Sequence, residues 1–351
     1  MRPARCGYLP GTLRRRCRPS VSRESDRRAP CYVPPAGKAS RHPTAATSPQ
    51  RVALSLDRAL SYDEQFTERD VIGEEVKRAL RWVKVSDDAV DLSYFPDFLI
   101  VGPQRTGTTW LHAQLRFHPQ VFLAEPKELY FFSSLKTRDP RRFVSDELAW
   151  YLQHFHDPLW RRAAKNGLSL WKYRQAYAPR VRGEATASYA ALDSDVIAEI
   201  VALNPQVKSL LMIRDPIERA WSHAKKDLVR NRKRRYEDVS EQEFRAFFTD
   251  PYQLRCARYT EQYDRWSAHL RPGHLFVGVF DDITKRPEAL LLDVLRFLGV
   301  RSEQRYIDPS VREPVNPTES TDMPQQYRRL LQDVLGRELE ALKDRFGLSW
   351  P

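Results

Sequence analysis

Three short runs of apolar residues predict buried strands, and each run is followed by a polar loop. The runs are 97–102, Val207–Ile213 and Leu275–Phe280. Apolar runs of roughly 4–8 residues, bounded by turn residues, are typical of strands that are covered on both faces. Because segments of helical periodicity alternate with these runs, the chain is predicted to be an α/β protein with a central, mostly parallel sheet.

Apolar residues recur at helical spacing in the segments between the strands. One predicted helix starts at Tyr62, a second ends at Phe117 and a third starts at Pro216. Four others cover 140–156, 253–270, 287–298 and 324–345. The apolar segment Glu128–Phe132 is predicted to be extended. No internal repeat is found, so we expect one domain from residue 56 to residue 351.

The first 55 residues differ from the predicted domain, which is called the body below. They are rich in Pro, Arg and Ser, and their apolar residues do not recur at a regular helix or strand spacing. They are predicted to be a disordered basic extension. Residues 1–50 hold ten Arg and one Lys against Glu24 and Asp26, so this segment carries +9 of the net charge of +12. The body is therefore nearly charge-balanced, and no nucleic-acid partner is predicted. The same composition fits an organellar transit peptide or a start codon chosen too far upstream, and the sequence does not separate the two.

Cysteine usage and hydropathy bear on the compartment. Cys6, Cys17 and Cys31 lie in the extension and Cys256 in the body, which is neither a disulfide framework nor a zinc motif. No apolar run approaches the roughly 20 residues of a membrane-spanning helix. We therefore expect a soluble cytoplasmic protein without an integral membrane segment.

The loop after the first strand has the glycine spacing of a phosphate-binding loop. It reads Gly102-Pro-Gln-Arg-Thr-Gly-Thr-Thr-Trp110 and leads into the helix that ends at Phe117. Backbone N–H groups of such a loop, at a helix N-terminus, bind phosphate. Thr108 stands where a nucleotide triphosphatase has lysine, and the positive charge lies at Arg105 instead. The alternative is a tight strand–helix turn that happens to contain glycine.

A second charged loop follows the strand that ends at Ile213. It reads Arg214-Asp-Pro-Ile-Glu-Arg-Ala-Trp-Ser222. An arginine at a strand end and a serine eight residues later, in the next helix, can hold one phosphate from two sides. The alternative is ordinary helix capping by Asp215 and Pro216, with Arg214 in solvent.

Both loops together resemble the sulfotransferases that use 3′-phosphoadenosine 5′-phosphosulfate (PAPS). The first is similar to the family's 5′-phosphosulfate loop, Lys-Ser/Thr-Gly-Thr-Thr-x-Leu, with Arg105 in place of the lysine. The second matches the family's 3′-phosphate signature, Arg-x-Pro-x-x-Arg-x-x-Ser, at every named position. The resemblance covers about residues 96–346 and implies a P-loop-like three-layer sandwich with a central, mostly parallel sheet.

The resemblance assigns roles to the residues of both loops. It implies that PAPS is a co-substrate, that 3′-phosphoadenosine 5′-phosphate (PAP) is the product, and that no metal takes part. The residues implied to bind PAPS are Arg105, Thr106, Gly107, Thr108, Thr109, Trp110, Arg214 and Ser222. Arg105 is also implied to act in catalysis as an electrostatic clamp, since a guanidinium does not deprotonate.

The acceptor side of the site is predicted from two glutamates. Glu128 stands in a segment that resembles the Glu-x-His/Gln-Phe-Phe segment of glycosaminoglycan sulfotransferases, which use this glutamate as general base. The alternative is a surface glutamate paired with Lys127. Glu184 is the second candidate, although Ala185 and Ala187 replace the lysine and proline of the family's next segment.

The function expected from these residues is transfer of a sulfuryl group from PAPS to a hydroxyl or amine of an acceptor. Carbohydrates and small molecules are both acceptors that the resemblance allows, and no pattern predicts the oligomeric state. The alternatives are a non-catalytic PAP- or nucleotide-binding module of the same fold and a small-molecule kinase. His154 and His156 are two residues apart and would not share a helix face, so a metal site is not predicted.

Overall fold

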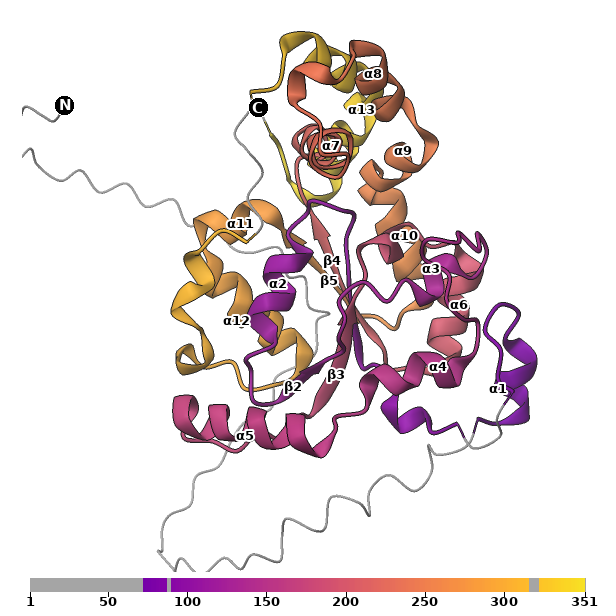
Figure 1. Cartoon of the computed structure of the whole chain (residues 1–351), viewed down its shortest axis with the longest axis vertical. Coiled ribbons are helices and arrows are strands. Elements are labelled where there is room, and N and C mark those ends of the chain that lie inside the picture. Colours follow the sequence, from indigo (N-terminus) through magenta and orange to yellow (C-terminus); the bar gives the residue numbers. More distant parts are fainter. Residues whose placement is uncertain (1–71, 87–89, 316–321, 351) are drawn as a thin grey trace, which may run out of the picture. The chain divides into compact units, whose positions relative to one another are not determined.

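The computed structural model describes residues 72–86, 90–315 and 322–350 (Figure 1). The basic extension 1–55, with its predicted disorder, lies outside the described residues. The first turns of the helix predicted from Tyr62 lie outside them as well.

Within the described residues, five strands form one sheet in which every neighbouring pair is parallel. The order is β2-β3-β1-β4-β5, with β1 Phe98–Val101, β2 Val121–Leu123, β3 Val181–Ala185, β4 Lys208–Ile213 and β5 Leu275–Val279. In register, Phe98 of β1 lies opposite Gly183 of β3 on one side and Lys208 of β4 on the other. The predicted parallel sheet and its three apolar strands are confirmed.

Helices make up most of the remaining described chain. The α-helices are α1 Glu74–Ala79, α2 Thr108–Leu115, α3 Phe131–Ser134, α4 Leu148–Leu152, α5 Leu159–Tyr173, α6 Ser194–Leu203, α7 Pro216–Ala224, α8 Glu241–Thr249, α9 Pro251–Ala257, α10 Tyr259–His269, α11 Phe280–Lys285, α12 Pro287–Leu298 and α13 Gln325–Phe346. Short 3-10 turns are η2 Leu92–Tyr94, η3 Gln153–Phe155, η4 Ala187–Ala191, η6 Tyr236–Asp238, η7 Gln304–Tyr306 and η8 Pro309–Arg312, and α7 continues into a π-helix, η5 Lys225–Arg230. No helix in this part of the chain is both long and apolar enough to cross a membrane.

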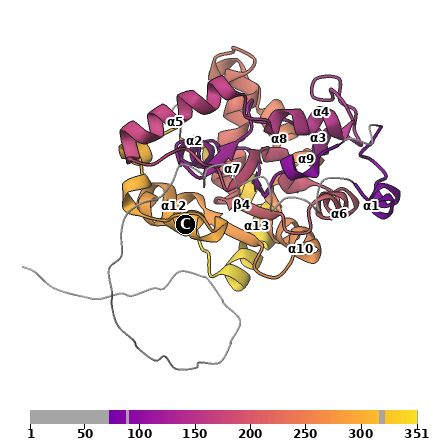
Figure 2. The same ribbon diagram turned by 90° about the horizontal axis from the view of Figure 1, so that it is seen from below.

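Alternation along β1 gives the sheet two apolar faces. Phe98 and Ile100 pack with residues of α2 and α12, whereas Leu99 and Val101 pack with residues of α6 and α10. Figures 1 and 2 show α2 and α12 on one side of the sheet and α6 and α10 on the other. The expected three-layer α/β sandwich is therefore confirmed.

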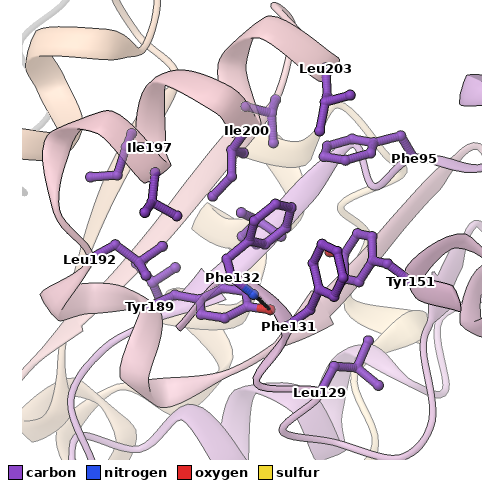
Figure 3. Close-up of a cluster of buried hydrophobic side chains, with 14 of the residues drawn as sticks. Phe95, Leu129, Phe131, Phe132, Tyr151, Tyr189, Leu192, Ile197, Ile200 and Leu203 are labelled. Atoms are coloured by element: carbon purple, nitrogen blue, oxygen red, sulfur yellow. Dashed lines mark hydrogen bonds between the residues drawn. The ribbon is translucent and has the colours of Figure 1, made fainter. Parts of the chain in front are cut away.

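An aromatic cluster on the α6 face fixes the segment that follows β2 (Figure 3). Phe131 stacks on Tyr151 of α4, with ring centroids 4.7 Å apart, and Phe132 meets Tyr189 edge-on at 5.6 Å. The Phe132 backbone N–H also donates to the Tyr189 hydroxyl at 3.2 Å. These contacts hold Leu129 and the two phenylalanines in the core.

Some predicted elements are wrong in detail. Glu128–Phe132 is not extended, because Glu128 and Tyr130 take left-handed backbone conformations and α3 begins at Phe131. The helix predicted for 140–156 begins only at Leu148, since Glu147 pairs with Lys84 in a β-bridge.

The helix predicted from Tyr62 ends at Ala79, after which the chain is extended at Leu80. The helix predicted for 253–270 is divided at Arg258 into α9 and α10. The remaining predicted helices correspond to α2, α7, α12 and α13.

The sheet leaves no room for a side chain at Gly183. A Cβ atom there would lie 2.4 Å from the Phe98 ring. We expect Gly183→Ala to lower the free energy of unfolding by about 1–3 kcal/mol, because the ring must shift within a packed core. Urea denaturation monitored by circular dichroism measures this change.

Gly336→Ala is the matched control for this substitution. Gly336 lies inside α13 and has open space where a Cβ atom would stand. The same change of residue should raise the free energy of unfolding there by about 0.5–1 kcal/mol. Equal effects of the two substitutions would contradict the close packing of β1 against β3.

Candidate active site

The two loops singled out in the sequence meet at the carboxyl ends of neighbouring strands. β1 leads through residues 102–107 into α2, and β4 leads through Arg214 into α7. The chain turns towards β2 after β1 and towards β5 after β4. Such a reversal opens a crevice between adjacent parallel strands, where α/β proteins bind their ligands.

A cavity of about 690 Å³ occupies this crevice. Its basic lining residues are Arg105, Lys127, Arg214, Lys225, Lys226, Arg230 and Arg328, and its acidic ones are Glu128, Glu218 and Asp322. Gly107, Thr108, Thr109, Trp110 and Ser222 also line it. The cavity therefore brings together Glu128 and all of the residues predicted to bind PAPS except Thr106. It carries an excess of positive charge that favours anionic ligands.

Thr106 is the exception among the predicted residues. It is fully buried, does not line the cavity, and its hydroxyl donates to the Pro103 carbonyl oxygen at 2.8 Å. Its side chain therefore stabilises the turn of the loop. Only its backbone is left for the binding role that the sequence predicts.

The N-terminus of α2 faces the cavity. Gly107 caps this helix in a left-handed conformation, with φ 96°, and a Cβ atom there would lie 2.4 Å from Ile283. The N–H groups of the first helical turn have no partner within the helix, so they are free to bind an anion. The Trp110 indole N–H donates to the Val311 carbonyl oxygen at 2.9 Å, which ties α2 to the segment that follows α12.

Two arginines and a serine link the two loops. The Arg105 Nε donates to the Ser222 hydroxyl at 2.9 Å, and an Arg214 Nη contacts the Arg105 carbonyl oxygen at 3.4 Å. Burial and the positive charges of Arg214 and Arg230 lower the pKa of Arg105, and burial lowers the pKa of Arg214. Holding both buried, positively charged guanidiniums close together costs free energy, and a bound anion would offset that cost.

Glu128 also lines the cavity. Its Oε2 accepts from the Ala187 backbone N–H at 2.9 Å, and its Oε1 pairs with Lys127. Its own N–H donates to the Ala185 carbonyl oxygen at 2.9 Å. Each carboxylate oxygen keeps a further lone pair that is able to accept a proton.

The backbone is strained at both candidate catalytic residues. Arg105 has φ 78° and Glu128 has φ 68°, a left-handed conformation that costs a non-glycine residue about 1–3 kcal/mol. Strain of this kind persists only where surrounding contacts determine the conformation, and it clusters at functional sites. Glu128 is held by the buried residues Leu129, Phe131 and Phe132 on one side and by the end of β3 on the other.

Glu184, the second candidate base, is in the core. It is 1% exposed, and its carboxylate accepts from the Tyr151 hydroxyl at 2.5 Å and from the Thr186 hydroxyl at 2.8 Å. It does not line the cavity. Burial raises the pKa of Glu184 to about 7.

The two histidines of the pair 154/156 contact different aromatic rings. His154 packs against Trp150 and His156 stacks on Tyr94. Among the described residues, no group of three or more His, Cys, Asp or Glu side chains is placed to hold a metal ion.

The π-helix η5 supplies cavity residues that the sequence did not predict. The Asn231 N–H donates to the Lys226 carbonyl oxygen at 2.8 Å, five residues back. Lys225, Lys226, Arg230 and Asn231 all line the cavity. The basic run from Lys225 to Arg235 was the available signal, but it does not indicate which side chains point inward.

The segment after α12 contributes to the far wall of the cavity. Pro314 and Val315 line it from one side of the undescribed residues 316–321, and Asp322 and Met323 line it from the other. Val311–Val315 is the described part of the segment that leads up to residue 316.

A comparison with protein families agrees with this geometry. The model of the sulfotransferase family matches residues 96–304, more than half of the chain. The chain belongs to the sulfotransferase family. The matched region contains all five strands, both loops and both glutamates of this sulfotransferase.

Known sulfotransferases are similar to parts of the chain. The human bifunctional heparan sulfate N-deacetylase/N-sulfotransferase 2 is 27% identical over 225 residues, 60% of this chain and 23% of the relative. The membrane-associated sulfotransferase kil1 of Dictyostelium discoideum is 26% identical over 127 residues, 36% of this chain and 22% of the relative. The chain thus spans about a quarter of the length of these curated relatives.

The chain is also similar to a solved sulfotransferase structure. The crystal structure of the enzyme from Alicyclobacillus acidocaldarius superposes with a TM-score of 0.49 at 22% identity. The superposition covers 73% of this chain and 97% of that one.

The buried carboxyl of Glu184 predicts a pH dependence of stability. Burial raises its pKa from the ordinary 4.5 to about 7 in the folded state, so the folded state holds the proton more tightly. The protonated Glu184 carboxyl therefore contributes fully to the free energy of unfolding below about pH 4.5. This contribution is lost as the pH rises to about 7. The loss should be on the order of 2–3 kcal/mol.

Comparison with Glu184→Gln isolates this effect, because glutamine keeps the shape and does not titrate. Urea midpoints at pH 5 and pH 7 should show the variant gaining stability relative to the wild type as the pH rises. Buried His112, His118 and His223 have pKa values lowered to about 4, 4 and 3, so they act in the opposite direction in both proteins. A difference between the two proteins that stays constant with pH would contradict the raised pKa.

Proposed function

We propose that the chain transfers a sulfuryl group from PAPS to a hydroxyl or amine of an acceptor. One observation carries this proposal: a single basic cavity at the ends of β1 and β4 holds Arg105, the pair Arg214 and Ser222, and the carboxylate of Glu128. Family membership narrows the reaction to sulfuryl transfer. The arrangement supplies two separate places for anionic groups and one candidate base beside them.

The donor would be held at its two anionic ends. Backbone N–H groups of Gly107, Thr108 and Thr109, together with Arg105, suit the 5′-phosphosulfate. Arg214 and Ser222 suit the 3′-phosphate, since a guanidinium and a hydroxyl approach one phosphate from two sides. Trp110, at the wall of the same cavity, is proposed to contact the nucleotide.

In the transfer step, Glu128 removes a proton from the acceptor O–H or N–H. The acceptor atom forms a bond to sulfur while the bond between sulfur and the 5′-phosphate oxygen breaks, so the electron pair leaves with PAP. Arg105 stabilises the charge that develops on that phosphate oxygen. Such a transition state is loose, as in phosphoryl transfer, so positioning and charge stabilisation dominate.

The acceptor class is proposed from the relatives. The name of the human relative describes N-sulfation of heparan sulfate, so a carbohydrate amine or hydroxyl is the first acceptor to test. The cytoplasmic location expected from the cysteine usage is part of this proposal.

A non-catalytic PAP-binding module is the competing function. It would share the cavity and bind PAP, but it would not need a carboxylate on the acceptor side. Release of PAP from PAPS in the presence of a carbohydrate acceptor distinguishes the two functions.

The assignment of the 3′-phosphate pair predicts selectivity between nucleotides. PAP at a hundredfold excess over its dissociation constant should stabilise the protein by about 2.7 kcal/mol, and ADP, which lacks the 3′-phosphate, should stabilise it far less. Arg214→Ala should weaken PAP binding by about 1.5–3 kcal/mol and leave ADP binding nearly unchanged. Thermal shift and calorimetric titration measure both. Equal shifts with PAP and ADP would contradict the role of Arg214 and Ser222.

The role of Glu128 predicts a separation of turnover from donor binding. Glu128→Gln keeps the shape but removes the base, so turnover should fall by about 10²–10⁴ while PAP affinity hardly changes. Arg105→Ala should weaken both, because Arg105 faces the donor. Steady-state turnover with labelled PAPS and titration with PAP separate the two effects.

Glu218→Gln is the control for the charge change. Glu218 also lines the cavity but pairs with Arg328 at 2.7 Å, so this variant removes one negative charge without touching the candidate base. If Glu128→Gln loses no more turnover than Glu218→Gln, Glu128 is not the base.

A further inference from the structure

Helix α5, outside the candidate active site, is oriented with its apolar face towards solvent. Trp160, Ala164, Leu168 and Trp171 follow one another at helical spacing and form one stripe along it. Trp160 is 71% exposed and Trp171 is 74% exposed. Surface helices of globular proteins normally turn this face towards the core, so α5 reverses the usual arrangement.

The polar face of α5 fixes this orientation. The Tyr177 N–H donates to Asn166 Oδ1 at 2.9 Å, and the Ser169 hydroxyl donates to the Gln175 carbonyl oxygen at 2.7 Å. Arg161 lies 3.5 Å from Glu125, and Lys172 pairs with Asp308. These contacts tie polar side chains on the inner side of the helix to the body, so the apolar stripe is held outward.

The exposed apolar surface of α5 is continuous and large. Leu159 is 84% exposed, and Leu168 and Leu170 are 46% and 45% exposed. Elsewhere in the described residues, the large exposed apolar side chains are only Val144 and Val334. In Figures 1 and 2, α5 lies on the outside of the body, away from the α7, α8 and α13 end. A patch of this kind on an otherwise polar surface marks an interaction site.

We propose that α5 docks the protein on the surface of an anionic lipid bilayer. Its sequence contains four basic residues and no acidic residue, with Trp and Leu on the opposite face. This combination is the signature of helices that lie in the interface of a membrane, with the apolar face among the acyl chains. Tryptophan is enriched where the lipid headgroups meet the acyl chains, and one tryptophan lies near each end of the stripe.

The exposed charge of the helix complements such a surface. The inward-facing Arg161 and Lys172 are each paired with an acid, whereas Arg162 and the C-cap residue Arg174 are exposed. Arg162 lies on the side of α5 away from the stripe, so Arg174, at the C-terminal end of the helix, is the exposed arginine that adds electrostatic attraction to negatively charged headgroups.

A second copy of the chain fits α5 less well. Helix α5 is a single helix of 15 residues, about 22 Å long. Each partner of a stable dimer contributes roughly 20–30 residues and 800 Å² of accessible surface. A bilayer needs no complementary contour, so a single protruding helix is sufficient there.

Binding of the full chain to vesicles tests this proposal. The probes are vesicles of phosphatidylcholine alone and of equimolar phosphatidylcholine and phosphatidylserine, read out by flotation. The double variant Trp160→Ser/Trp171→Ser should lower the partition coefficient on the anionic vesicles by about tenfold or more. Both side chains are mostly exposed, so melting temperature and PAP binding should not change.

The control is Val144→Ser/Val334→Ser, which removes apolar side chains exposed outside α5. It should bind vesicles like the wild type. Because the basic residues 1–50 attract anionic vesicles as well, the comparison is repeated at about 1 M salt, where the Debye length is about 3 Å. Apolar insertion by α5 should persist there and should be lost in the tryptophan variant.

Two outcomes would overturn the proposal. The first is equal vesicle binding by the wild type and the tryptophan variant at both salt concentrations. The second is a dimer in light scattering that the tryptophan substitutions convert to a monomer while vesicle binding stays the same, since α5 would then bind a second copy.

Discussion

The pairing of β1 with β4 is the contact on which the candidate site depends. These strands are far apart in the sequence, yet Phe98 lies opposite Lys208 and Val101 opposite Leu211. Parallel register brings both carboxyl ends to the same edge, so the loop with Arg105 and the loop with Arg214 meet without any further element. The bond between Arg105 and Ser222 joins the two loops directly.

A second constraint is the aromatic cluster under the acceptor side. Phe131 and Phe132 contribute no polar group to the cavity, but their burial against Tyr151 and Tyr189 fixes the strained backbone at Glu128. Tyr151 also donates to Glu184 at the end of β3. The two glutamates therefore have different environments, because Glu128 lines the cavity and Glu184 is buried in the core.

The sequence predicted the parts of the fold whose pattern is local. β1, β4 and β5 are continuous apolar runs, and the glycines and the Asp215-Pro216 pair mark the helix starts after β1 and β4. β2 was missed because it has three residues, and β3 because Arg182 and Glu184 interrupt its apolar pattern. Burial of Glu184 depends on Tyr151 and Thr186, which no local pattern reveals. Helix α5 was missed although its apolar residues recur at helical spacing. The left-handed turn at Glu128 was missed because an apolar run favours extension.

The π-helix η5 has a consequence for how the cavity tolerates insertions and deletions. A π-turn holds one more residue than an α-turn, so losing one codon between Lys225 and Arg230 would let the segment relax to an α-helix. The residues after the deletion would keep nearly the same direction relative to α7, because the π-turn accommodates its extra residue within a single turn. Arg230 and Asn231 would therefore still face the wall of the cavity. The loss of one codon within the regular helix α7 would instead rotate every later residue of the helix by about 100°. A change in the length of the gene by one triplet would thus be tolerated in η5 and would disrupt the cavity in α7.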